Sequence, residues 1–70
     1  MRIRLSDPAL VDELLDYLWR HDAVAERSDG ALITASLPAA SRADAAELEL
    51  DLYLRVFEAT HPGTRIERIA

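Results

Sequence analysis

Segments with strand-like and with helical spacing of apolar residues alternate along this chain, and their order limits the fold more than any other feature. Residues 1–5 alternate between apolar and polar side chains, which is typical of a half-buried strand. A helix is predicted from Pro8 to about Arg20, because apolar residues recur there at three- and four-residue spacing. Asp7 is its predicted N-cap, since a carboxylate there can accept from the first free amides.

The middle of the chain predicts a hairpin. Two strand-like segments flank Asp29 and Gly30, a dipeptide typical of two-residue hairpin turns. A direct turn at this dipeptide places Val24 and Ile33 on the core face of the sheet, and it places Arg27 on the opposite face.

A second helix and a last strand complete the pattern. Residues 41–44 resemble a capping box and open a helix that runs to about Thr60. Within it, residues 48–54 alternate like a strand, but the segment is long and rich in Ala, Leu and Glu, which favours a helix. Residues 64–69 are predicted to form the final strand.

The resulting order, strand-helix-strand-strand-helix-strand, predicts one α+β domain over residues 1–70. For a chain of this length the leading topology is the ferredoxin-like βαββαβ sandwich. Its antiparallel sheet has the spatial order 4-1-3-2, and both helices cover one face.

Composition excludes several classes of protein. The chain has no Cys, so it forms no disulfide or thiolate metal site. It has no apolar run long enough to cross a membrane, so a cytoplasmic protein is expected. All positively charged side chains are Arg, and the chain is rich in Ala. Both features are typical of bacterial proteins from genomes of high GC content.

Charge is divided unevenly between the predicted helices and the sheet. The net charge of −5 combines two acidic helices with a sheet whose uncovered face is predicted to carry Arg2, Arg4, Arg27 and Arg65. Arg binds carboxylates and phosphates through paired hydrogen bonds, so this face is a candidate site for a small anion. The alternative is a solvated face whose arginines pair with nearby carboxylates.

The second predicted helix has more apolar surface than one core requires. One apolar stripe is expected to face the sheet, and it consists of Ala45, Leu48, Leu52, Val56 and Ala59. The other is expected to be only partly covered by the first helix, and it consists of Ala46, Leu50, Tyr53, Leu54 and Phe57. A small core without disulfides favours oligomers, so a homodimer or another protein partner is predicted. The candidate self-association surface is Trp19, Leu50, Leu54 and Phe57. The open sheet face, which is predicted to carry Leu32 and Ile69, is the alternative dimer surface.

The sequence lacks the residue patterns typical of nucleic-acid binding, metal binding and catalysis. The predicted open sheet face has no aromatic residue for stacking bases, and a pI near 4.8 opposes nucleic-acid binding. The spacing of His21 and His61 relative to carboxylates matches no metal motif. Because no nucleophile or acid-base pair stands out, a non-enzymatic protein without cofactor is predicted.

The segment Asp7-Pro8-Ala9-Leu10 resembles the turn that opens the first helix of ACT-type regulatory domains, with Ala9 where that family has Gly. The chain also resembles short bacterial proteins with this order of elements. The ACT resemblance implies a βαββαβ fold that binds a small ligand such as an amino acid. From the apolar surface of the second helix and the absence of a catalytic pattern, the leading hypothesis is a self-associating interaction module. The alternative is an ACT-like sensor of an anionic metabolite, which would use Arg4, Arg65 and the amides after Asp7.

Overall fold

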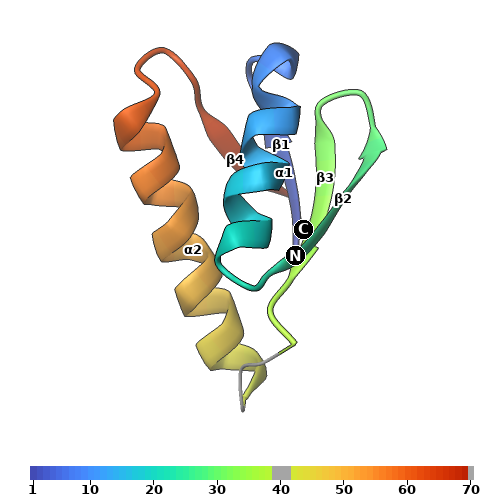
Figure 1. The fold of residues 1–70 in the computed structure, drawn as a ribbon, viewed down its shortest axis with the longest axis vertical. Helices are drawn as coiled ribbons and strands as arrows, with labels where there is room; N and C mark the ends of the chain where they lie inside the picture. The colour runs from blue at the N-terminus through green and yellow to red at the C-terminus, as the bar shows by residue number, and fades with distance from the viewer. Residues whose placement is uncertain (39–41, 70) are drawn as a thin grey trace.

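The computed structural model describes residues 1–38 and 42–69, and it confirms an α+β chain with two helices and a four-stranded antiparallel sheet (Figure 1). The elements are β1 (Arg2–Leu5), the 3-10 turn η1 (Pro8–Leu10), α1 (Val11–Arg20), β2 (Val24–Asp29), β3 (Leu32–Ser36), α2 (Ala43–Thr60) and β4 (Ile66–Ile69). The segment with strand-like alternation, residues 48–54, is helical.

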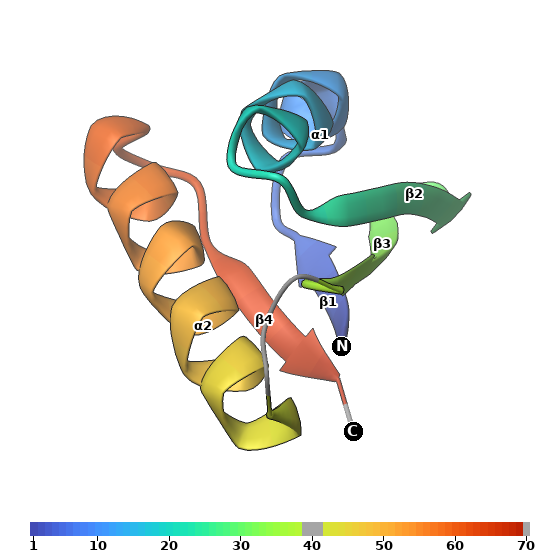
Figure 2. The ribbon, with the colours of Figure 1, turned by 60° about the horizontal axis from the view of Figure 1, so that its bottom comes forward.

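The sheet has the order β2-β3-β1-β4, which read from the β4 edge is 4-1-3-2. Strand β1 is central and pairs with both β3 and β4, and Ile3 lies opposite Ile33. Figure 2 shows both helices on the same side of the sheet, with α1 next to β2 and α2 next to β4. The opposite face of the sheet is therefore open.

The core lies between the helices and the inner face of β1, β2 and β3. It is made of apolar side chains that are each less than a tenth exposed: Ile3, Leu5, Val11, Leu14, Leu15, Leu18, Ala23, Ala25, Ile33, Ala35, Leu37, Leu50, Leu54 and Phe57. Only one of these residues is aromatic, so the core depends heavily on Phe57.

The predicted N-cap of the first helix is confirmed. Asp7 Oδ1 accepts a hydrogen bond from the Ala9 amide at 3.0 Å, and the Leu10 amide donates to the Asp7 carbonyl at 3.1 Å. The first turn after Pro8 is a 3-10 turn, and the α-helix begins at Val11. The predicted cap of the second helix involves Ser41, which lies outside the described residues.

The predicted hairpin register is wrong by one residue in β2. Ala25 lies opposite Ala35 and Arg27 opposite Ile33, so Ala25 is buried and Val24 is 57 % exposed. A register shift between Arg27 and Asp29 accommodates the extra residue, and the turn is made by Gly30 and Ala31. The observed register places Glu26 on the open face, whereas the predicted register would have buried its carboxylate at a large energetic cost.

The orientation of α2 is the reverse of the predicted one. Leu50, Leu54 and Phe57 are only 2 %, 6 % and 1 % exposed. They therefore cannot form a self-association surface, and that prediction is wrong for all three. With about 100° per residue, the predicted orientation would have put Glu49 and Arg55 about 60° from the buried direction. The observed orientation turns both charged side chains further toward solvent.

The other apolar stripe of α2 faces outward. Its larger members, Leu48, Leu52 and Val56, are 72 %, 60 % and 47 % exposed. We refer to Ala45, Leu48, Leu52, Val56 and Ala59 together as the outer stripe.

Candidate functional site

Two of the four predicted arginines, Arg2 and Arg4, stand on either side of Ile3 in β1 and project from the open sheet face. Arg2 lies between Thr34 of β3 and Ile69 of β4. Arg4, two residues further along β1, lies between Leu32 and Glu67 of the same two strands. Both side chains are exposed, and neither forms an ion pair with a residue that the structure describes. These two positions agree with the sequence-based prediction.

Arg27 does not belong to this face. The corrected hairpin register places it opposite Ile33, on the side of the sheet that the helices cover, and its guanidinium pairs with Asp12 of α1 at 3.8 Å. The prediction that Arg27 joins an anion-binding face is wrong, because the shift in β2 reverses the side to which the residue points.

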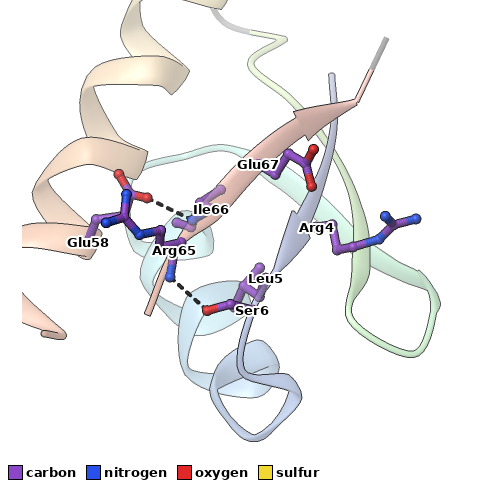
Figure 3. A pocket seen from close by; sticks show the side chains of 7 residues that line it. All are labelled: Arg4, Leu5, Ser6, Glu58, Arg65, Ile66 and Glu67. Atoms are coloured by element: carbon purple, nitrogen blue, oxygen red, sulfur yellow. Dashed lines mark hydrogen bonds between the residues drawn. The ribbon is translucent and has the colours of Figure 1, made fainter. Parts of the chain in front are cut away.

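Arg65 precedes β4 and shares an open pocket with Arg4 (Figure 3). The pocket has a volume of about 390 Å³ and is lined by Arg4, Leu5, Ser6, Glu58, Arg65, Ile66 and Glu67. Two hydrogen bonds hold its wall: the Arg65 amide donates to Ser6 Oγ at 2.8 Å, and the Ile66 amide donates to Glu58 Oε2 at 2.7 Å.

The charge in this pocket is balanced rather than positive. Two arginines stand against Glu58 and Glu67, and in Figure 3 the guanidinium groups of Arg4 and Arg65 point away from each other. The amides after Asp7 are already occupied, because that residue accepts from both of them. The turn that resembles the ACT motif therefore has no free amide at these two positions for a ligand.

Aromatic and imidazole rings join the two helices, a cluster that the sequence analysis missed. Tyr17 packs against Phe57 with ring centroids 5.5 Å apart, and His21 stacks on Tyr53 at 4.6 Å. His61 stacks on Phe57 at 3.9 Å. The four-residue spacing along each helix and its C-cap residue, from 17 to 21 and from 53 through 57 to 61, is the signal that could have identified the cluster.

One row of hydroxyl, imidazole and carboxylate groups occurs here among the described residues. His61 Nε2 lies 3.2 Å from Glu13, and its Nδ1 lies 3.0 Å from Thr60 Oγ1. However, Nδ1 also lies 2.8 Å from the Phe57 carbonyl, which competes with the Thr60 hydroxyl for this nitrogen. The Thr60 hydroxyl donates to the Val56 and Phe57 carbonyls at 3.2 and 3.0 Å, so its proton is directed into the helix and not toward His61. The row locks the end of α2 and does not activate a nucleophile.

Tyr17 connects the helices through its hydroxyl, which donates to the Tyr53 carbonyl at 3.0 Å. Burial, and then the nearby Tyr53 hydroxyl, raise the pKa of Tyr17 above its ordinary value of 10.0. The neutral phenol therefore stabilises the fold fully below pH 10, and this contribution is lost as the pH rises through the higher folded-state pKa.

Both edges of the sheet are partly covered. Trp19 is 54 % exposed, but its indole Nε1 donates to the Ala25 carbonyl of edge strand β2 at 2.9 Å. On the other edge, Glu58 accepts from the Ile66 amide of β4. Occupied edge groups discourage pairing with strands of another chain. Among the described residues, the outer stripe of α2 holds three of the five large apolar side chains that are exposed, Leu48, Leu52 and Val56.

Comparison with known proteins adds no relative: no protein-family model matches the sequence, and no curated protein or solved structure is significantly similar to it. Among residues 1–38 and 42–69, no helix is long and apolar enough to cross a membrane. The same residues contain no cluster of three or more His, Asp or Glu side chains suited to a metal ion.

Proposed function

We propose that this protein is a non-enzymatic interaction module with a ferredoxin-like fold that self-associates through the outer stripe of α2. The observation that carries the proposal is the exposure of Leu48, Leu52 and Val56 on a helix whose opposite face already supplies the core. Contiguous exposed apolar surface of this kind is typical of protein interaction sites. The two sheet edges are poorer candidates because a side chain occupies one backbone group on each edge strand, the Ala25 carbonyl of β2 and the Ile66 amide of β4.

A second copy of the chain is the proposed occupant of this surface. A domain of 70 residues has a small core, and oligomerisation is a common way to add buried apolar area at this size. The flanks of the outer stripe carry both signs of charge, with Asp51 and Arg55 3.0 Å apart on one side. A surface that carries both charges can complement a copy of itself.

We expect light scattering at high micromolar concentration to give about twice the 7.8 kDa mass of one chain. Replacing Leu52 with Asp places two carboxylates at the proposed contact. It should raise the dissociation constant about 100-fold or more, because each carboxylate loses water without gaining a partner.

The matched control is Val24→Asp, which changes an equally exposed apolar residue on the open sheet face. It should leave the dimer intact. A native protein that stays monomeric at high concentration contradicts self-association, and dissociation by Val24→Asp alone would place the contact on the sheet.

A second candidate function is the binding of a small anionic or zwitterionic metabolite beside Arg4 and Arg65. It is supported by the exposure of Arg2, Arg4 and Arg65 without an ion-pair partner among the described residues. A ligand at a hundredfold excess over its dissociation constant stabilises a protein by about 2.7 kcal/mol, which a thermal-shift assay with phosphate and amino acids detects. Arg4→Gln should abolish any such shift, and an unchanged shift would exclude this pocket.

A further inference from the structure

We infer that the two copies pack their α2 helices antiparallel, related by a two-fold axis that passes beside Leu52. This inference rests on the proposed self-association and specifies how the two helices are arranged in the dimer. Three features of α2 carry it: the spacing of the outer stripe, the sizes of its side chains and the charges along its flanks.

The spacing of the outer stripe is symmetric about Leu52. Its members lie seven and four positions before Leu52 and four and seven positions after it. A two-fold axis requires that if one residue contacts a second, the second contacts the first in the partner copy. In an antiparallel pair, Leu52 then meets Leu52, Leu48 meets Val56 and Ala45 meets Ala59.

Side-chain size follows the same symmetry. The three large residues occupy the middle of the outer stripe, and an Ala stands at each end. Rows of side chains four residues apart, such as Leu48, Leu52 and Val56, are the ridges that interlock in the commonest class of helix packing. Small residues at the ends let two crossing helices diverge without leaving large apolar groups in water.

Charge distinguishes the antiparallel from the parallel arrangement. Viewed along the helix, Asp51 and Arg55 lie on one flank of Leu52, and Glu49 lies on the other. Antiparallel helices bring like flanks together. With a rise of 1.5 Å per residue, Arg55 of one copy then lies about 3 Å along the axis from Asp51 of the other. The two Asp51 side chains are also about 3 Å apart along the axis, and the two Arg55 side chains, about 9 Å apart, stand at either end of this carboxylate pair.

The same flank has room for this contact. A groove of about 440 Å³ runs beside it and is lined by Asp44, Glu47, Leu48, Asp51, Arg55 and Arg68. Each of its carboxylates already pairs with an arginine of the same copy: Asp44 with Arg42 at 3.2 Å, Glu47 with Arg68 at 2.9 Å and Asp51 with Arg55 at 3.0 Å. In the antiparallel pair the partner's Arg55 therefore shares the Asp51 carboxylate with an existing ion pair. In a parallel pair this flank faces the opposite one, where Glu49 of the partner is about 9 Å along the axis from Arg55.

Disulfide trapping tests the geometry, because the chain has no Cys of its own. We expect Leu52→Cys to form a covalent dimer under mild oxidation, since a residue on the axis meets its own copy. A mixture of Leu48→Cys and Val56→Cys should form mainly the mixed disulfide. Native-like circular dichroism of each reduced variant establishes that it is folded.

Three other results would each contradict a different claim: the antiparallel geometry, the use of the α2 surface, or self-association itself. If Leu48→Cys and Val56→Cys cross-link mainly to themselves, the helices are parallel, and the antiparallel inference fails while self-association stands. If light scattering shows a dimer but Leu52→Cys does not cross-link, the dimer uses another surface. A strict monomer contradicts the proposed function itself.

A charge-swap pair provides an independent test by light scattering or ultracentrifugation. Arg55→Asp should raise the dissociation constant about tenfold, because two symmetric ion pairs become repulsive contacts. Adding Asp51→Arg should restore most of the affinity, since the swapped pair is again complementary across the axis. Failure of the double variant to recover, with the dimer otherwise intact, would overturn the pairing of Asp51 with Arg55.

Discussion

Phe57→Ala should leave most of the chain unfolded at 25 °C. Phe57 is 1 % exposed and is the one aromatic residue among the fully buried core side chains of the described structure. Replacing a buried Phe with Ala costs about 3–5 kcal/mol, because transfer energy is lost and a cavity remains. A single core in a domain of this size supplies only about 3–5 kcal/mol in total. The measurement is urea unfolding followed by far-ultraviolet circular dichroism.

The neighbouring residue is the control. Val56→Ala alters an exposed position on the same helix and should change the free energy of unfolding by no more than about 0.5 kcal/mol. Both variants are compared at a dilution at which light scattering shows monomers, so that dimer contacts do not contribute. Equal destabilisation by the two variants would mean that α2 does not bury the face described above.

Glu58→Ala should lower the free energy of unfolding by about 1–3 kcal/mol, because it removes a charged acceptor from the partly buried Ile66 amide. The hydrogen bond of 2.7 Å ties α2 to edge strand β4, and β4 has only four residues. Loss of the bond should therefore also speed hydrogen exchange at the Ile66 amide.

Glu49→Ala is the matched control for this prediction. Glu49 lies on the same helix, is exposed, and has no hydrogen bond or ion pair with the described residues. Its replacement should change the stability by about 0.5 kcal/mol or less and leave exchange at Ile66 unaltered. Unchanged exchange at Ile66 in Glu58→Ala would show that the carboxylate does not anchor β4.

The sequence predicted the type and order of the elements because local spacing carries that information. Alternation identified β1, the cap at Asp7 identified the start of the first helical segment, and composition outweighed the misleading alternation within α2. Two faces were predicted wrongly. The hairpin failed because a single extra residue between Arg27 and Asp29 reverses every side chain before it in β2. The orientation of α2 failed because both of its stripes are apolar, so hydrophobicity alone could not rank them.

In the candidate site, too, the positions that depend on local alternation were predicted correctly, and those that depend on register or packing were not. Alternation alone placed Arg2 and Arg4 on the open face, but the position of Arg27 depended on the hairpin register and was wrong. The link between His61 and Glu13 could not be predicted, because it joins residues 48 positions apart through the packing of two helices.

By itself, the sequence determined which segments are helices and strands, the excess of apolar surface on α2 and the symmetric spacing around Leu52. These properties depend on residues within a few positions of one another. The tertiary structure alone decided which stripe of α2 enters the core. Phe57 stacks with Tyr17 and His61 in the space beside α1, whereas the other stripe would have carried Glu49 and Arg55 toward the interior. Leu48, Leu52 and Val56 are consequently left in solvent, and that choice defines the surface proposed for self-association.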